Sequence, residues 1–219
     1  MVKIAVGICT YSESRGLDRL LAQIEGHVDK TIVVHGPFPH FGMQDPRSID
    51  DTRKVCSHYS NVHLIDIPEP THENERRETY LLLMHDYDFC ITLDSDEYII
   101  DADWDLLRTN CEQIKDSNKP FWLYNIRYID VHHANSGEFP RLFHRPSEIR
   151  YYQKHYWFML PTGVIAAGCA DSRKTITGIK IKHDKAHRSQ ERNEGMYAHQ
   201  KWLLNHDSQF VITSKQKII

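Results

Sequence analysis

The sequence predicts an α/β protein in which a mixed, mostly parallel sheet is flanked by helices. Through the first 100 residues, short continuous apolar runs alternate with longer amphipathic stretches. Continuous apolar runs are typical of strands buried on both faces, and their alternation with helices is typical of a parallel sheet. After Trp104 and one more helix, the chain becomes rich in aromatic, half-polar segments. The second half is therefore expected to be β-rich, with mixed or antiparallel strands that keep one solvated face.

The elements of the first half follow from the spacing of their apolar residues. Helices are expected where apolar residues recur every three or four positions, and strands where a short apolar run is bounded by polar residues or glycine. The expected strands span residues 2–9, 31–36, 62–67 and 88–99, and the expected helices span residues 16–28, 48–59 and 72–85.

The second half begins with a helix expected over residues 105–117. It is followed by segments whose aromatic and β-branched residues favour strands. These segments span residues 121–130, 139–145, 150–160 and 175–184, and a last helix is expected over residues 189–208. The apolar side chains of that helix, which include Trp202 and Leu203, predict that it packs back on the body of the protein.

Length and composition favour one domain without a general affinity for polyanions. A chain of 219 residues fits a single domain, which on folding buries roughly 70% of the surface of its unfolded chain. The 27 Lys and Arg residues nearly balance 30 Asp and Glu residues, which excludes the basic field of a general nucleic-acid or membrane binder. No apolar run approaches the roughly 20 residues of a membrane span.

The cysteines indicate a reducing compartment. The chain holds five, an odd number, and they are widely spaced without a CxxC pair. This pattern argues against a disulfide framework and against a structural zinc site. The amino terminus leads directly into an expected strand, without the apolar region and cleavage site of a signal peptide. We therefore expect a cytoplasmic protein.

Three acids stand at the end of the expected strand 88–99, which reads DFCITLDSDEYI. Asp94, Asp96 and Glu97 need solvent, a basic partner or a metal ion, because burial of an unpaired carboxylate costs several kcal/mol. The chain has four Asp-x-Asp pairs, and only the 94/96 pair ends an apolar strand. Ligands of open α/β sheets bind at the carboxyl ends of strands, so this pair is a candidate site. The alternative is a surface turn with solvated acids.

Two carboxylates at a strand end are suited to a hard divalent cation. Asp94 and Asp96 would leave coordination positions of Mg²⁺ or Mn²⁺ open for phosphate oxygens. An imidazole in the same shell would favour Mn²⁺. His183 and His187 are candidates because they follow an expected strand, although most of the 15 histidines of such a chain have surface or hydrogen-bonded roles.

Basic residues point to a diphosphate ligand. Arg76 and Arg77 lie in the helix that leads into the acidic strand, and residues 173–192 carry seven Lys or Arg against two acids. Cations beside a metal ion would neutralise a departing nucleoside diphosphate. For the two arginines, the alternative is pairing with Glu73 and its neighbours on the same helix.

Six segments carry a family resemblance. In chain order they read ICTYSE, NERRE, ITLDSDEYI, FPRLFHR, RYYQKHY and IKHDKAHR. In these segments the chain resembles the GT-A glycosyltransferases of the family-2 type, over nearly its whole length. The resemblance implies a Rossmann-like GT-A fold in a single domain over residues 1–219. Residues 1–100 would be the nucleotide-binding half, and residues 101–219 the acceptor-side half with the C-terminal helix.

The resemblance also implies a metal site and a nucleotide site. Asp94 would approach the nucleotide ribose or the metal ion, Asp96 would bind the ion, and His183 would complete the shell of Mn²⁺ or Mg²⁺. Further nucleotide contacts are carried onto Thr10, Tyr11 and Glu13 after the first strand, Arg76 or Arg77 in the helix before the acidic strand, and, for the diphosphate, Lys185 and Arg188. The donor would be a UDP- or GDP-sugar.

The chain departs from the family pattern at two places. An Asp commonly follows the second strand and contacts the base, but this sequence has His35 there, so the base stays open. The acceptor-side acid, often part of an ED or HE pair, is also missing. Glu138 and Asp130 are the nearest replacements, and we expect Glu138 to act as the base that deprotonates the acceptor. The acceptor would be a glycan or another hydroxyl compound, and a nucleic acid is not excluded.

Taken together, these features predict a metal-dependent glycosyltransferase that uses a nucleotide-diphosphate sugar. One alternative is a nucleotidyltransferase on a similar fold, against which stands the absence of a Gly-rich phosphate loop in GICTYSESRG after the first strand. Another alternative is a non-catalytic carbohydrate- or nucleotide-binding protein. The missing acceptor-side acid leaves that alternative open, and measured turnover would exclude it.

Overall fold

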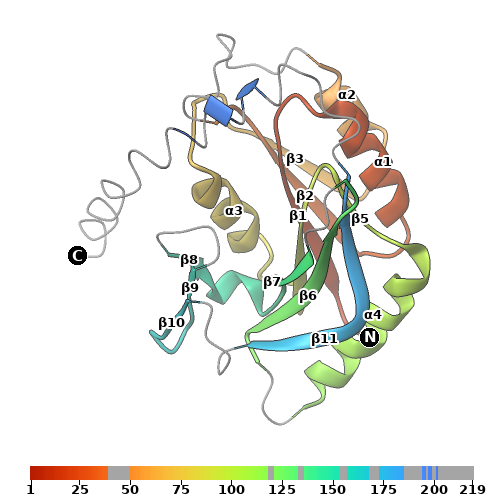
Figure 1. Cartoon of the computed structure of the whole chain (residues 1–219), viewed down its shortest axis with the longest axis vertical. Coiled ribbons are helices and arrows are strands. Elements are labelled where there is room, and N and C mark those ends of the chain that lie inside the picture. Colours follow the sequence, from red (N-terminus) through yellow and green to blue (C-terminus); the bar gives the residue numbers. More distant parts are fainter. Residues whose placement is uncertain are drawn as a thin grey trace.

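The computed structural model describes residues 1–38, 50–117, 121–132, 136–152, 157–167 and 173–184, together with residues 194, 195, 197, 198 and 201. Within these residues the chain forms a mixed α/β fold around one large, curled sheet (Figure 1). The predicted α/β class is confirmed.

The first half alternates strands and helices in the predicted order. The strands are β1 (Ile4–Thr10), β2 (Lys30–His35), β3 (Val62–Asp66) and β4 (Phe89–Asp94), and the helices are α1 (Ser14–Ile24), α2 (Thr52–Ser57) and α3 (Glu73–Leu82). β1 lies between β2 and β4, β2 pairs with β3 on its other side, and all three pairings are parallel. This parallel unit is the one that the apolar runs predicted.

The second half adds the mixed strands. Its elements are β5 (Glu97–Ile99), α4 (Asp101–Lys115), β6 (Leu123–Asp130), β7 (Ser136–His144), the 3₁₀ turn η1 (Pro146–Glu148), β8 (Arg150–Tyr151), β9 (Trp157–Met159), β10 (Ile165–Ala167) and β11 (Arg173–His183). β7 is antiparallel to β4 and to β6, whereas β11 is parallel to β6. β8, β9 and β10 form a small separate sheet.

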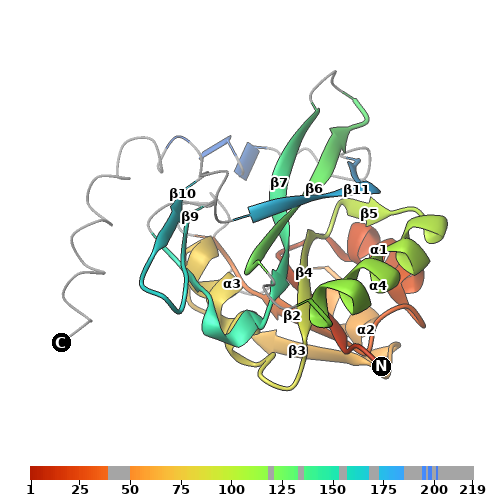
Figure 2. The ribbon, with the colours of Figure 1, turned by 90° about the horizontal axis from the view of Figure 1, so that it is seen from below.

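The large sheet has the order β3-β2-β1-β4-β7-β6-β11-β5. β5 is antiparallel to β11 at one edge of this sheet, although only two residues separate it from β4 along the chain. The strands from β4 to β5 must therefore curl so that β5 returns to the end of β4, as Figures 1 and 2 show. This curl brings the end of β11 to the turn at Ser95 and Asp96 between β4 and β5, the acidic turn.

The predicted strand over residues 88–99 is wrong in one respect, because it is two strands separated by a turn at Ser95 and Asp96. The break is caused by pairing at long range: β4 pairs with β1, and β5 pairs with β11. Two further boundaries differ. The predicted helix 48–59 is described only over Thr52–Ser57, and residues 173–183 of the basic stretch form strand β11, whose register with β6 shifts between Thr175 and Lys180. Most of the predicted helix 189–208 lies outside the described residues.

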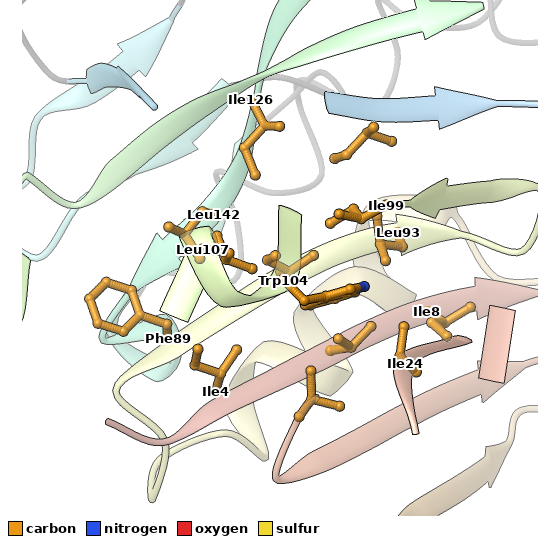
Figure 3. Packing of buried hydrophobic residues seen from close by; sticks show 14 of the residues in the cluster. Ile4, Ile8, Ile24, Phe89, Leu93, Ile99, Trp104, Leu107, Ile126 and Leu142 are labelled. Carbon is orange, nitrogen blue, oxygen red and sulfur yellow. The ribbon is translucent and has the colours of Figure 1, made fainter. Parts of the chain in front are cut away.

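Two hydrophobic clusters cover the two faces of the sheet. Side chains along β1 alternate between them, with Ile4 and Ile8 in the first cluster and Ala5 and Cys9 in the second. The first cluster also contains side chains of α1, α2 and α4, among them Trp104 (Figure 3), and the second contains side chains of α3. Helices α1, α2 and α4 therefore cover one face and α3 covers the other (Figures 1 and 2).

None of the helices in the described part of the chain is long and apolar enough to cross a membrane.

Candidate functional site

The parallel strands end together at one edge of the sheet. In the register of these strands Thr10 of β1 lies opposite His35 of β2, and Cys9 of β1 lies opposite Asp94 of β4. Thr10, His35 and Asp94 were all predicted from the sequence as nucleotide contacts, and the fold brings them side by side. The carboxyl edge of a parallel sheet is the usual place for a ligand in folds of this class.

Each of the three acids at the end of β4 has its own partner, and each partner comes from a different element. The pairs are Asp94 with Arg77 of α3 at 2.8 Å, Asp96 with His183 of β11 at 2.9 Å, and Glu97 with Arg141 of β7 at 2.5 Å. Their side chains differ in exposure, which is 32% for Asp94, 3% for Asp96 and 1% for Glu97. The turn thus satisfies two buried carboxylates internally and leaves Asp94 in contact with solvent.

Asp96 and His183 form the pair with the chemistry of a metal site. Asp96 Oδ2 lies 2.9 Å from His183 Nε2, and both side chains are buried. Two ligands in adjacent positions of an octahedral ion, each about 2.1 Å from it, lie roughly 3 Å apart, so the two atoms fit one shared ion. In the described part of the chain, no group of three or more His, Cys, Asp or Glu side chains could hold a metal ion.

His183 is held from its other ring nitrogen. Tyr128 Oη contacts Nδ1 in a short hydrogen bond, and Asp130 Oδ2 lies 3.6 Å from the same nitrogen. Burial and the nearby carboxylates of Glu97 and Asp130 raise the pKa of Tyr128, so its hydroxyl stays protonated. Asp130 also accepts a hydrogen bond from the backbone N–H of His132 at 2.9 Å. These contacts fix the direction in which Nε2 faces Asp96.

Arg77 links Asp94 to α3. Its guanidinium donates to Asp94 Oδ1 at 2.8 Å and to Glu73 Oε1 at 2.5 Å, and only 3% of its side chain is exposed. Burial lowers the pKa of Arg77, but the carboxylates of Glu73 and Asp94 outweigh burial and raise the pKa well above its usual value. The predicted alternative for Arg77, pairing with Glu73, is present together with the contact to the acidic turn.

The acidic turn is hydrogen-bonded to the residue before α1 and to the residue after β11. Ser95 Oγ donates to Glu13 Oε2 at 2.9 Å, and the backbone N–H of Asp184 donates to the carbonyl oxygen of Asp96 at 2.9 Å. Gly16 of α1 permits the close approach, because a Cβ at this position would lie 2.6 Å from the carbonyl oxygen of Ser95. Glu13 therefore supports the turn, a role that differs from the predicted contact with the nucleotide.

Gly16→Ala is expected to destabilise the protein, although alanine is the better helix former by about 1 kcal/mol. The added methyl group would press on the backbone of Ser95, and overpacking of this kind costs about 1–3 kcal/mol. Denaturant unfolding measures the free energy. Arg15→Ala, at the exposed neighbouring position of α1, is the control and should change it little. A Gly16→Ala protein more stable than the wild type would contradict the close approach.

His35 presents a polar ring at the same edge. Its Nδ1 lies 2.7 Å from Asp66 Oδ1, and Arg53 Nε donates to the other oxygen of Asp66 at 2.9 Å. Burial lowers the pKa of His35, although Asp66 opposes this effect, while the hydrogen bonds from Arg53 and His35 outweigh the effect of burial on Asp66 and lower its pKa. A neutral ring that donates from Nδ1 to a carboxylate has its acceptor lone pair on Nε2. Among the described residues, Nε2 is buried without a hydrogen-bond partner.

Three predicted site residues lie differently from expectation. Arg76 is fully buried, stacks over the ring of Phe38 at 3.5 Å and donates a hydrogen bond to the carbonyl oxygen of Gly36, so it holds the segment after β2. Tyr11 is fully buried, and its ring centroid lies 6.0 Å from that of His35. Glu138 is exposed and accepts a hydrogen bond from Thr175 Oγ1 at 2.6 Å.

Register explains the position of Glu138. It is the cross-strand partner of Arg127, whereas Tyr128, the next residue of β6, contacts His183. Successive side chains of a strand point to opposite faces, so Glu138 points away from the face that carries Tyr128 and His183. The geometry therefore gives no support to Glu138 as the base. Lys185, His187 and Arg188 lie outside the described residues.

Arg141, Tyr128 and Asp66 were not predicted from the sequence as residues of the site. A signal for Arg141 existed, because it is a charged residue inside the apolar strand FPRLFHR. A buried charge of this kind needs a partner. Nothing in the local sequence identified that partner as Glu97, which is 44 residues away.

The curled sheet of this chain has a parallel first half and a mixed second half, in which β7 is antiparallel to β4 and β6 and β11 is parallel to β6. Comparison with solved structures supports this fold. The GT-A-type glycosyltransferase TarS of S. aureus, residues 1–349, matches with a TM-score of 0.59 and 13% sequence identity, over 96% of this chain and 69% of that TarS fragment.

Two ligand complexes of the same TarS fragment match equally well or nearly so. The complex with UDP-GlcNAc has a TM-score of 0.59 and 12% identity, and the complex with UDP has 0.56 and 13%; each match covers 96% of this chain and 70% of the TarS fragment. No protein-family model and no curated protein matches the sequence. The chain therefore has a GT-A glycosyltransferase fold, and at such low identity the likeness concerns the fold alone.

Proposed function

We propose that this protein transfers a sugar from a nucleotide-diphosphate sugar to a hydroxyl acceptor, with the help of Mn²⁺ or Mg²⁺. The observation that carries the proposal is the pair of Asp96 and His183, which face each other at 2.9 Å beside the carboxyl edge of a GT-A sheet. The hydrophobic core does not require a carboxylate and an imidazole at this position, since two apolar side chains of similar size would stabilise the fold as well.

The metal ion would be held by Asp96 and His183, with Asp94 next to it. Two protein ligands leave coordination positions for water and for the phosphate oxygens of the donor, which is how such ions are usually bound with nucleotides. When bound, the ion would stabilise negative charge on the departing diphosphate. The imidazole ligand favours Mn²⁺ over Mg²⁺.

Tyr128 and Asp130 would act through His183. Their contacts with Nδ1 orient the ring, so that Nε2 stays directed at Asp96 and the ion. Asp130 was predicted as a replacement for the missing acceptor-side carboxylate. We propose that it orients His183 instead, because its two oxygens already face His183 and the backbone N–H of His132.

The edge at β1 and β2 offers groups that a nucleotide base could contact. Thr10 Oγ1 and His35 Nε2 lie on neighbouring strands in register, and both are buried without a hydrogen-bond partner among the described residues. The acceptor lone pair of His35 Nε2 complements the N3–H group of uracil and, equally, the N1–H group of guanine. The match to TarS structures with UDP and UDP-GlcNAc favours uracil, so we propose a UDP-sugar as the donor.

Titration calorimetry with UDP tests the proposed function. We expect UDP to bind in the presence of Mn²⁺ and to bind much more weakly when EDTA is added, with GDP weaker than UDP under both conditions. A second assay follows the release of UDP from UDP-GlcNAc and other UDP-sugars. Absence of any Mn²⁺-dependent nucleotide binding would exclude the transferase, while binding without turnover of any sugar donor would favour the non-catalytic alternative.

His35→Phe is expected to weaken the binding of UDP by about 10-fold or more, because a base N–H that loses its acceptor costs about 1–3 kcal/mol. Manganese pyrophosphate, which has no base, should bind to the variant and to the wild type equally. His63→Phe, at an exposed position of β3, is the control. Equal loss of UDP and pyrophosphate binding would show that His35 supports the fold of the site and does not recognise the base.

A further inference from the structure

Glu97 and Arg141 form a closed pair beneath the candidate metal site. Arg141 Nη2 lies 2.5 Å from Glu97 Oε1, and the two side chains are 4% and 1% exposed, so their charged groups are buried against each other. The second oxygen of Glu97 accepts a hydrogen bond from the backbone N–H of Asp94 at 2.9 Å. Arg141 Nη2 also lies 4.0 Å from Asp94 Oδ2. The pair therefore contacts Asp94 at its backbone and faces its side chain.

The backbone N–H of Asp94 needs this acceptor because the pairing of β4 with β7 has ended before it. The register of these two strands runs from Phe89 opposite His144 to Ile91 opposite Leu142 and continues no further. Beyond Ile91, the edge of β4 that faces β7 has no strand to accept its N–H groups. Glu97 takes over that function for Asp94 from three residues further along the chain.

Arg141 reaches the turn because β7 carries a bulge at this residue. Tyr124 of β6 lies opposite Leu142, and the next residue, Asn125, lies opposite Pro140, so Arg141 is the extra residue of β7. Leu142 points into the first hydrophobic cluster, and simple alternation would send Arg141 to the other face. The bulge redirects its side chain to Glu97, which lies on the same face as Ile99 of the first cluster.

Stability alone does not explain this pair. A buried ion pair is usually no more stabilising than two apolar side chains of the same size, because desolvation of both charges offsets their attraction. A bulge that aims a buried arginine at a buried glutamate, which in turn holds the backbone of Asp94, is explained by a role in the geometry of the turn.

We propose that Glu97 and Arg141 are positioning residues of the donor site, which fix the turn so that Asp94 and Asp96 face the metal ion and the diphosphate. The proposal rests on the proposed function. It also connects the two halves of the protein, since Arg141 belongs to β7 on the acceptor side and the turn belongs to the nucleotide side. Neither residue is expected to touch the donor.

The test is the double variant Glu97→Met/Arg141→Met, which removes both charges and keeps two side chains of suitable volume. We expect its melting temperature without ligand to fall by only a few degrees, because the backbone N–H of Asp94 loses its acceptor while no buried charge is left unpaired. Its affinity for UDP in the presence of Mn²⁺, measured by calorimetry, should fall by about 10- to 100-fold, as for other residues that orient metal ligands. UDP binding in EDTA should not change.

Two further proteins complete the experiment. Arg141→Lys keeps the charge but has no planar fork with which to contact Glu97 and the carbonyl oxygen of Thr92 together, so it should weaken Mn²⁺-dependent binding by about 10-fold without unfolding. If the double variant fails to fold, the Arg141→Lys protein alone tests the positioning role. Arg145→Met/Glu148→Met, which removes an ion pair near the end of the same strand with side chains 56% and 33% exposed, is the control and should bind as the wild type does.

The outcomes separate the two proposals. If the wild type itself binds no UDP with Mn²⁺, the proposed function fails, and the positioning role fails with it. If the wild type binds and a folded double variant binds equally well, or if Arg141→Lys binds equally well when the double variant does not fold, the positioning role alone is overturned. Weaker Mn²⁺-dependent binding at a melting temperature within a few degrees of the wild type, together with unchanged UDP binding in EDTA, supports it, because a purely structural pair would not produce that combination.

Discussion

Asp96→Asn is expected to reduce Mn²⁺-dependent sugar transfer by about 100-fold or more, because the ion supplies several kcal/mol of charge stabilisation and this variant removes its carboxylate ligand. The shape of the side chain is kept, and Asn Oδ1 can still accept a hydrogen bond from His183 Nε2. The change also relieves repulsion between Asp96 and the neighbouring carboxylates of Asp94 and Glu97. The melting temperature without metal should therefore stay the same or rise slightly.

The control for this variant is Asp86→Asn. Asp86 precedes β4, its side chain is 72% exposed, and it belongs to another Asp-x-Asp pair of the chain. Release of UDP from a UDP-sugar is measured for both variants over a range of Mn²⁺ concentrations. Full Mn²⁺-dependent turnover by the Asp96→Asn protein would rule out this residue as a metal ligand. A loss of turnover accompanied by a large fall in melting temperature would indicate a structural role in its place.

The sequence identified the acids at the end of β4 because their signal is local. An apolar run that ends in Asp94, Ser95 and Asp96 is visible within a few residues, and the alternation of strands and helices before it predicts the edge at which the run ends. His183 could be suggested because it follows a strand-like segment. That its Nε2 would face Asp96 depends on the curl of the sheet, and the curl depends on the pairing of β5 with β11, more than 70 residues apart.

The parts of the site that the sequence did not predict depend on register. Whether Glu138 shares a face with Tyr128 is decided by the pairing of β6 with β7, and a slip of one residue would reverse the answer. The role of Arg141 depends on a bulge in the same pairing. The spacing of apolar residues predicts neither feature, although the charge of Arg141 within the apolar strand FPRLFHR indicates that a buried partner exists.

Arg77→Met is expected to lower the free energy of unfolding by about 3 kcal/mol, the lower end of the range for breaking one side of a buried ion pair. Arg77 is 3% exposed, and its guanidinium is shared by Glu73 and Asp94. Without it these two carboxylates would face each other across a buried methionine. The lower end of the range applies because Glu73 and Asp94 are 22% and 32% exposed, so that water can solvate them in part.

For a protein of this size, a loss of about 3 kcal/mol corresponds to a melting temperature lower by roughly 6–12 °C. Arg53→Met is the matched control, because Arg53 also pairs with a carboxylate, Asp66, at 2.9 Å, but both side chains are at least 40% exposed. Exposed pairs contribute about 1 kcal/mol or less, so this variant should melt within a few degrees of the wild type. Equal melting temperatures for the two variants would mean that Arg77 is solvated in solution. In that event it would be free to bind the donor diphosphate directly, and the contact with Asp94 would not hold the turn.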